Sequence, residues 1–318
     1  MTDAEIAAEA LYYWGSAGAP LRLVWQSENV VFETRLQGGV RAALRLHRPG
    51  YQGRGGIEAE LAWCAELAAA GVPVAAPIRA VDGRFTAGLP GRVVSCVAWV
   101  EGEPLGAADA GLSGSAVLAQ AGAVGGLIAR LHNAIDAGAA PGGRRPAWDA
   151  EGLLGETPRW GRFWEHPDLT PAEANLLLLA RRRAFEALAE ARDYGPIHAD
   201  VIRGNVILGP AGLTLIDFDD SGPGWRLYDL ASALVQSFGD PLMGAQAVAL
   251  VAGYRGERPL AADQAALLPL FVALRAFASA GWVVSRTAPG DARRRAYAAR
   301  AVAAGRALLE GRAPWEAS

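Results

Sequence analysis

The sequence predicts an α+β protein with two lobes, a small antiparallel-sheet lobe over residues 1–100 and a larger, mainly helical lobe over residues 101–318. Three observations predict this class. Short strand-like segments dominate the first 100 residues. The sequence pattern changes at Glu101–Gly106, and long helix-like segments fill most of the remainder. A chain of 318 residues is long enough to form two hydrophobic cores.

The first lobe begins with a predicted helix over residues 2–14, because Thr2 and Glu5 form a capping-box pattern and Gly15 follows the last turn. Three apolar segments then predict strands. A Gly38-Gly39 pair separates the last two of them, which is typical of a tight hairpin. The three segments read "LRLVWQ", "VVFETRL" and "RAALRLH".

A glycine-rich break precedes a predicted helix over residues 57–70, in which Ile57, Leu61 and Cys64 fall on one stripe. At 100° per residue, Glu60 flanks that stripe by about 60°, so it can reach across the buried edge of the helix. The segment "RVVSCVAWV" predicts a further strand before the second lobe begins.

The second lobe is predicted to contain helices over residues 115–134 and 170–193, separated by a loop over residues 138–148 that is rich in proline and glycine. Thr170, Pro171 and Glu173 form a strong start signal for the second of these helices, and Gly195 is expected to end it. Two short strands, "NVILG" and "LTLIDF", follow around a turn, and helices fill the rest.

Composition limits the class of function. The formal net charge is −3, so there is no general attraction to nucleic acid or to an anionic membrane. The sequence shows no secretory signal pattern and no apolar run of membrane-spanning length. The two cysteines form no metal motif, and we therefore expect a cytoplasmic enzyme. All 30 basic residues are Arg, so any role that usually falls to Lys must fall to Arg.

The segment "IHADVIRGNVIL" contains the strongest chemical signal. It places Asp200 two residues after His198 and five residues before Asn205, and Asp217 follows at the end of the next predicted strand. Composition alone would give about 0.002 matches to the pattern His-x-Asp-x-x-x-x-Asn. An Asn carbonyl and an Asp carboxylate suit Mg²⁺, and a second Asp can accept a proton from an attacking hydroxyl.

These residues resemble the signature of the aminoglycoside phosphotransferase/choline kinase superfamily, which are relatives of the protein kinases. The resemblance implies a bilobal protein-kinase-like fold. It implies that Asp200 is the catalytic base, that Asn205 and Asp217 hold Mg²⁺, and that His198 buttresses the loop. Asp219 is expected near the metal or the substrate.

Asp229 matches a family position that usually braces the catalytic loop. A carboxylate in the first turn of a helix is an equally good interpretation of this residue. Ala199 stands where the family usually has Gly.

The resemblance extends to the nucleotide site in the first lobe. Ser27, Glu28 and Asn29 would lie over the phosphates, where a tight β-turn offers backbone N–H groups. Arg45 occupies the position of the usual phosphate-binding Lys, and Glu60 matches its ion-pairing acid. An Arg can neutralise phosphates and pair with Glu60, although its planar fork differs in shape from an ammonium group.

We therefore expect a phosphotransferase that moves the γ-phosphate of a Mg-nucleotide, ATP or GTP, to a hydroxyl of a small molecule or a protein. Because Arg45 replaces the usual Lys, a non-catalytic nucleotide-binding regulatory protein is the main alternative. A helical binding module with a fortuitous motif is the third. The chain looks closest to bacterial stress-response kinases and type II homoserine kinases.

The acceptor remains open at this point. The acidic run at Asp217, Asp219 and Asp220 is modest for a polycationic aminoglycoside. Aromatic residues could pack as core or could wall a substrate site, with Trp160, Phe163 and Trp164 at helical spacing and with Trp225, Tyr228 and Trp282 available for an ammonium cage.

Overall fold

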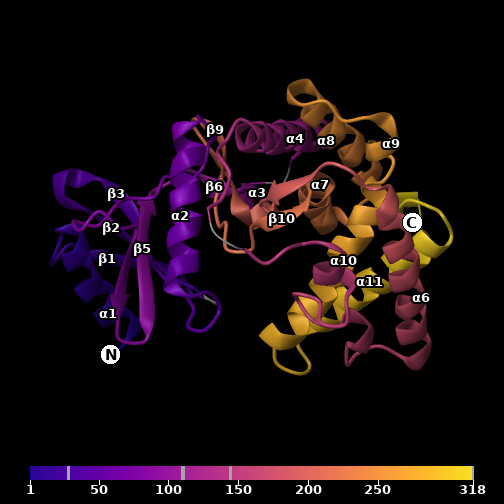
Figure 1. The fold of residues 1–318 in the computed structure, drawn as a ribbon, viewed down its shortest axis with the longest axis horizontal. Coiled ribbons are helices and arrows are strands. Elements are labelled where there is room, and N and C mark those ends of the chain that lie inside the picture. Colours follow the sequence, from indigo (N-terminus) through magenta and orange to yellow (C-terminus); the bar gives the residue numbers. More distant parts are fainter. Residues whose placement is uncertain (27–28, 109–111, 143–144, 317–318) are drawn as a thin grey trace. The chain divides into compact units, whose positions relative to one another are not determined.

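The computed structural model describes residues 1–26, 29–108, 112–142 and 145–316. The chain divides into two compact units, which are described separately. Unit 1 comprises Met1–Pro104, Ala134–Arg144 and Val206–Asp219, and unit 2 comprises Leu105–Asn133, Arg145–Asn205 and Asp220–Ser318. The sequence colours of Figure 1 allow each segment to be followed.

The centre of unit 1 is an antiparallel sheet with the strand order β1-β2-β3-β5-β4. A turn lies between the second and third strands as predicted, but it is longer than a two-residue hairpin turn, because Gln37–Gly39 forms a short 3₁₀ turn. Gly38 and Gly39 both adopt the positive φ that glycine tolerates best. The elements of unit 1 are α1 (Asp3–Ala10), β1 (Leu21–Gln26), β2 (Val30–Arg35), β3 (Arg41–Leu46), α2 (Arg54–Ala69), β4 (Thr86–Leu89), β5 (Arg92–Ala98), β6 (Glu103–Pro104), β8 (Val206–Gly209) and β9 (Gly212–Leu215).

Different helices cover the two faces of this sheet (Figure 1). Cys96 of β5 belongs to the core cluster that α1 shares with the sheet, whereas its neighbour Val97 packs against the cluster that contains Ile57 of α2. Side chains alternate along a strand, so Arg45, which is paired with Ser95, lies on the α2 face. This alternation places Arg45 on the same face of the sheet as Glu60.

The β8–β9 hairpin was expected in the second lobe, but it clusters with unit 1. The reason is pairing: β8 pairs with β6, and Leu215 of β9 forms a parallel bridge with Val74. Gly102 and Gly209 allow the backbone at β6 to approach the backbone of β8 closely. A Cβ on Gly102 would lie 2.2 Å from the Leu208 carbonyl oxygen, and one on Gly209 would lie 2.0 Å from the Glu101 carbonyl oxygen.

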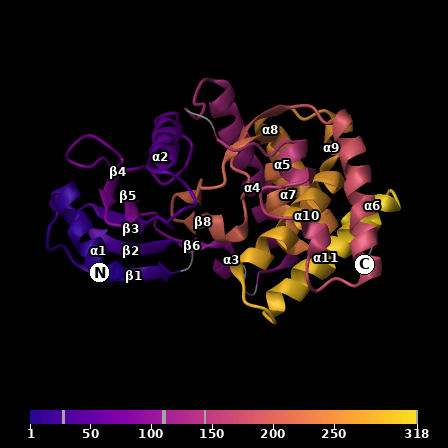
Figure 2. The same ribbon diagram turned by 60° about the horizontal axis from the view of Figure 1, so that its bottom comes forward.

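Unit 2 is mainly helical, and α10 is its most buried long helix. Helix α10 packs on α7 and α11, and α11 packs on α6, as Figure 2 shows. The elements of unit 2 are α3 (Leu105–Ala108), most of α4 (Gly114–Asp136), α5 (Ala150–Leu154), α6 (Pro171–Ala187), β7 (Tyr194–Ile197), β10 (Gly222–Trp225), α7 (Arg226–Leu234), α8 (Met243–Glu257), α9 (Ala262–Ala265), α10 (Leu268–Arg286) and α11 (Ala292–Leu309).

Two sequence predictions in unit 2 were wrong in detail. The helix expected to run to residue 193 ends at Ala187, and Gly195 lies inside strand β7 rather than at a helix end. The cause is non-local, because β7 pairs with β10. Trp160, Phe163 and Trp164 do not share one helix face: Trp160 lies in a loop, and Phe163–Glu165 forms a short 3₁₀ turn. All three side chains are nevertheless buried.

Two helices in the described residues, Gly114–Asp136 and Ala262–Arg286, are long and apolar enough to cross a membrane by length and composition alone. In the second, 78% of the apolar window is buried inside the structure, as in the core helix of a globular unit.

Candidate active site

The loop that follows β7 carries the His198–Asn205 motif in unit 2. Ala199, buried at the second position of the motif, has a φ of 68°, in the left-handed region where a Cβ is strained. This conformation explains the Gly that the resemblance predicts here. In this turn the His198 Nδ1 atom accepts from the Asp200 backbone N–H at 3.3 Å, which is a contact within the loop itself.

Asp229, on α7, braces the same loop through hydrogen bonds to its backbone. Its carboxylate is fully buried and accepts from the backbone N–H groups of His198 at 2.9 Å and Ala199 at 2.6 Å, with His132 Nε2 at 3.1 Å. Burial alone would raise the pKa of Asp229, but the contacts with His132 and His198 outweigh it and lower that pKa. The geometry therefore decides in favour of the bracing role over a free helix-end carboxylate.

The Asp200 side chain is fixed at both oxygens. Its Oδ1 accepts from Arg275 Nη2 at 2.5 Å, and its Oδ2 accepts from Asn205 Nδ2 at 2.9 Å. The Asn205 amide nitrogen also donates to the Asp200 carbonyl at 3.0 Å. Because both contacts use the nitrogen, the Asn205 carbonyl oxygen is turned away from Asp200 and available to another group.

Arg275 is a site residue that the sequence reasoning missed. It lies on α10, its side chain is only 5% exposed, and its guanidinium is held in place on several sides. Nε donates to the Ser232 hydroxyl at 3.1 Å, Nη1 donates to the Ser279 hydroxyl at 2.8 Å, and the guanidinium lies 4.6 Å from the centre of the Trp160 ring. The sequence signal that could have identified it is its position, a single charged residue directly after the apolar run "ALLPLFVAL".

In unit 1, Arg45 brings together two of the predicted acidic residues. Its Nη2 donates to Asp217 Oδ1 at 2.9 Å and to Asp219 Oδ2. Burial opposes its charge, but the carboxylates of Asp217, Asp219 and Glu60 outweigh burial and raise the pKa of Arg45. Glu60 is itself 2% exposed, so α2 supplies a buried negative charge to the strand that carries Arg45.

Asp219 is the hub of a wider network in unit 1. Asn29 Nδ2 donates to its carboxylate at 2.9 Å, and Gln52 Nε2 donates to its backbone carbonyl at 2.5 Å. The Asn29 side-chain oxygen in turn accepts from the Arg48 backbone N–H at 2.9 Å. Gln52 carried no sequence signal. Of the three residues predicted over the phosphates, Ser27 and Glu28 lie outside the described residues.

Asp217 is held in an unusual conformation at the end of the hairpin. Its φ is 65°, and its side chain is 40% exposed although one oxygen contacts Arg45. A strained, solvent-accessible carboxylate is typical of a functional position rather than of a packing one. The Asp217 carboxylate and the Asn205 side-chain carbonyl are each an oxygen ligand of the kind that Mg²⁺ prefers, so the chemistry of these donors suits a magnesium ion.

Comparison with known proteins gives the family. A family model described as the phosphotransferase enzyme family matches residues 21–269. The chain belongs to this family. It is a phosphotransferase, as the resemblance implied, and the family match covers both the Arg45 strand and the Asp200 loop.

Relatives of this phosphotransferase include proteins with named activities. It is 34% identical to the structure of a microcompartment-associated aminopropanol kinase, with a TM-score of 0.85, covering 97% of this chain and 98% of that one. It is 30% identical to a homoserine kinase of Neisseria meningitidis, over 64% of this chain and 63% of that protein. It is 35% identical to an uncharacterized protein of Deinococcus radiodurans, over 80% and 75%. The protein-kinase-like α+β fold is thereby confirmed.

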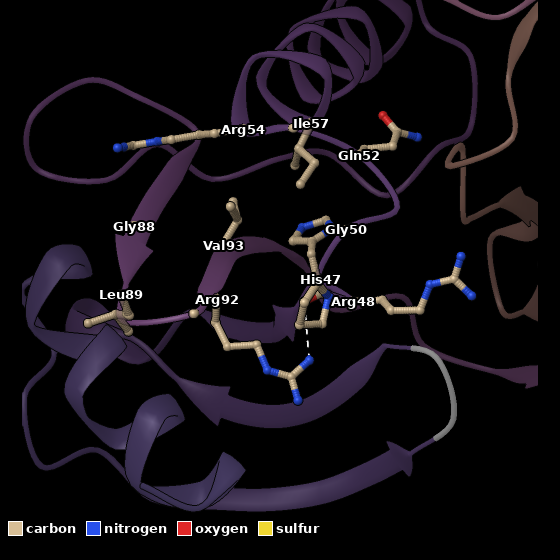
Figure 3. Close-up of a pocket in the computed structure, with 13 residues that line it drawn as sticks. His47, Arg48, Gly50, Gln52, Arg54, Ile57, Gly88, Leu89, Arg92 and Val93 are labelled. Atoms are coloured by element: carbon tan, nitrogen blue, oxygen red, sulfur yellow. Dashed lines mark hydrogen bonds between the residues drawn. The ribbon is translucent and has the colours of Figure 1, made fainter.

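A pocket of about 350 Å³ in unit 1 of the phosphotransferase shares Arg48 and Gln52 with the network around Asp219. Arg48, Arg54 and Arg92 line this pocket, and Figure 3 shows that the Arg54 and Arg48 side chains point to opposite sides. Arg54 contacts the Thr86 hydroxyl and carbonyl, and Arg92 contacts Asp3 and the His47 carbonyl. Their charges do not converge, so we assign this pocket no role in the reaction.

His47, beside this pocket, gives the phosphotransferase a pH-dependent stability. Burial, reinforced by the charge of Arg45, holds the pKa of His47 well below 6.5, and its Nε2 contacts the Ser95 hydroxyl at 2.8 Å. Below pH 6.5 the unfolded chain binds a proton at His47 that the folded chain does not bind. The free energy of unfolding must therefore fall as the pH falls from about 6.5 towards the lowered folded-state pKa.

We expect His47→Gln to flatten this pH dependence by up to about 1.4 kcal/mol per pH unit, the value for one proton. Urea unfolding of both proteins at pH 7, 6 and 5 measures it. His132, whose pKa burial also lowers, leaves a residual slope in the variant. Parallel curves for the two proteins would mean that His47 is protonated in the folded state.

Proposed function

We propose that the protein transfers the γ-phosphoryl group of ATP, bound with Mg²⁺, to the hydroxyl of a small amino alcohol. The observation that carries this proposal is Asp200, a carboxylate fixed at both oxygens at the head of a braced loop. A fixed carboxylate of this kind can orient a hydroxyl and accept its proton.

In the proposed reaction, the acceptor oxygen forms a bond to the γ-phosphorus while the bond from that phosphorus to the β-phosphate oxygen breaks. The hydroxyl proton passes to Asp200, and ADP leaves. His198 and Asp229 keep the loop in its strained conformation, so that the Asp200 carboxylate is placed before the acceptor arrives.

Asn205 and Asp217 are the proposed ligands of Mg²⁺, which neutralises phosphate charge when it is bound. Asn205 immediately precedes β8, and Asp217 follows β9 by two residues. Val206 and Leu215 are partners in the hairpin, so both residues belong to the same end of it. The outward-turned Asn205 carbonyl and the exposed Asp217 carboxylate support this role.

Arg45 is the proposed phosphate-binding cation, supported by its permanent charge and by Glu60 behind it. Its contacts with Asp217 and Asp219 fix the position of its guanidinium group. Asn29, with Ser27 and Glu28, is proposed to form the loop over the phosphates. The carbonyl and amide of Asn29 already connect Asp219 to the backbone of residue 48.

The acceptor is proposed from the relatives. Aminopropanol and homoserine, which the two named kinases act on, both carry an amine and a primary or secondary hydroxyl. We propose an acceptor of this chemistry rather than a protein or a polycationic antibiotic. We propose a cytoplasmic enzyme whose partners are a nucleotide and a small molecule. The net charge of −3 supports the part of this proposal that excludes nucleic acid and membrane partners.

In the presence of Mg²⁺, we expect ATP to be consumed only when an amino alcohol is also present. A coupled ADP-release assay with ATP and with GTP, against ethanolamine, aminopropanol and homoserine, tests this directly. Thermal stabilisation by Mg-ATP without turnover of any acceptor would instead favour the non-catalytic nucleotide-binding alternative, because a ligand of the folded state raises stability without chemistry. No stabilisation and no turnover would contradict both.

A further inference from the structure

Two buried polar atoms near Asp200 lack a hydrogen-bond partner among the described residues. They are the hydroxyl of Tyr228, which is fully buried, and the indole Nε1 of Trp160, which is 7% exposed as a residue. Buried polar groups are nearly always satisfied, so two unsatisfied ones beside a proposed catalytic carboxylate require an explanation.

Both side chains pack on a third aromatic residue, Trp148. The Tyr228 ring stacks on Trp148 at 5.3 Å between ring centres, and the Trp160 ring meets Trp148 edge-on at 4.9 Å. The Trp148 indole nitrogen donates to the Asp220 carbonyl at 2.7 Å, so this aromatic cluster of Trp148, Trp160 and Tyr228 is anchored to the chain that follows β9.

The aromatic cluster is joined to the catalytic loop through Arg275. The Arg275 guanidinium lies over Trp160 and donates to Asp200, so a single residue separates Trp160 from the catalytic carboxylate. The position of Trp160 is fixed by α10 as well: a Cβ on Gly281 would lie 2.7 Å from the Trp160 carbonyl oxygen and 2.5 Å from that of Gly161.

Charges around the Tyr228 hydroxyl decide which partner it can take. Burial raises the pKa of Tyr228, Arg275 and Arg159 oppose the rise, and the carboxylates of Asp200 and Asp220 reinforce it. The phenol therefore stays protonated at neutral pH. An indole N–H can only donate, so both unsatisfied atoms are able to donate to an oxygen.

We propose that the Tyr228 hydroxyl and the Trp160 indole N–H bind an oxygen of the phosphate acceptor other than the hydroxyl that receives the phosphate. The acceptor is then an amino alcohol with a second oxygen function, a hydroxyl or a carboxylate. This inference rests on the proposed function, because it takes Asp200 as the residue that meets the reacting hydroxyl.

A matched set of acceptors tests the proposal. Ethanolamine, serinol and L-serine share one aminoethanol core, to which serinol adds a hydroxymethyl group and L-serine a carboxylate; propanolamine and L-homoserine form a longer pair. We expect kcat/KM to be about 10- to 100-fold higher for compounds with the second oxygen. A larger increase for serinol would show that the subsite prefers a hydroxyl, and a larger increase for the amino acids would show that it prefers a carboxylate.

In Tyr228→Phe and Trp160→Phe, the ratio of kcat/KM between compounds with and without the second oxygen should fall about 10-fold, whatever the change in kcat/KM for ethanolamine or propanolamine. Tyr254→Phe is the matched control, because it removes a buried hydroxyl that contacts His132 at 2.9 Å outside the cluster. It should reduce stability and keep the preference. An unchanged preference in both cluster variants would overturn the proposal and assign the two atoms to ordered water.

A binding measurement separates this proposal from the proposed function. If no compound is turned over, calorimetric titration of the same set into protein saturated with Mg²⁺ and a non-hydrolysable ATP analogue is decisive. Binding of the oxygen-bearing compounds that weakens about 10-fold in Tyr228→Phe supports the subsite. Binding of none of them overturns it, whereas stabilisation by Mg-ATP alone still supports the nucleotide site of the proposed function.

Discussion

Replacing Asp200 by Asn is expected to lower kcat by about 10²- to 10⁴-fold while the affinity for nucleotide stays nearly unchanged. The substitution keeps the size of the side chain but removes its ability to accept the acceptor proton. It also presents an amide to Arg275 Nη2, which donates to the Asp200 carboxylate at 2.5 Å in the structure. Steady-state turnover and nucleotide titration of the same preparation measure the two effects separately.

Asp168→Asn is a suitable control, because Asp168 is a partly buried carboxylate elsewhere in unit 2 whose backbone contacts His166. Turnover in this control should match the unaltered protein. If Asp200→Asn retained more than about a tenth of the activity, the carboxylate would be excluded as the general base. A thermal-shift comparison with Mg-ATP shows whether a loss of activity arises from chemistry or from unfolding.

Replacing Arg275 by Met is expected to lower the stability of the fold, and this is the second largest effect that we predict. The substitution breaks the ion pair with Asp200, in which the Arg275 side chain is buried. The Arg275 side chain is 5% exposed and the Asp200 side chain is 18% exposed, so Asp200 keeps some access to water. Loss of one partner of a buried pair costs about 3–5 kcal/mol, and we expect the lower end of that range here. Urea unfolding measures this loss.

Turnover should fall in Arg275→Met as well, since the Asp200 carboxylate loses a donor that orients it. Arg275→Lys should recover part of the stability and less of the activity, because a single ammonium cannot reach Ser232, Ser279 and Asp200 together. Added guanidinium ion at low concentration should raise kcat of Arg275→Met and leave that of Arg275→Lys unchanged. Normal kcat in a stably folded Arg275→Met protein would contradict the positioning role.

Local patterns in the sequence predicted the elements whose hydrogen bonds close within a few residues. The capping boxes at Thr2 and Thr170 are present as expected, and so is the Gly38-Gly39 turn. The same holds for the catalytic loop, where the contact between Asn205 and Asp200 spans five residues. The helical position of Glu60 also predicted that its side chain could reach across the buried edge of its helix, and the resemblance paired it with Arg45.

Tertiary structure decided the features that depend on pairing or packing between distant segments. Strand β7 exists because β10 pairs with it, so a predicted helix ended too late. Arg275 meets Asp200 across 75 residues, and Trp160 gains its place from the close approach of Gly281. In each case the stabilising contact is made by a partner that no window of local sequence contains.

The sequence by itself therefore determined which chemistry this protein carries, because the acidic and amide residues of the catalytic loop lie within a few positions of one another. Only the tertiary structure decided what surrounds that chemistry. The guanidinium of Arg275, which contacts Asp200, comes from α10, and the aromatic residues of the cluster come from α7 and from the chain on either side of α5. Their meeting depends on how buried surfaces pack, which periodicity and spacing along the chain do not specify.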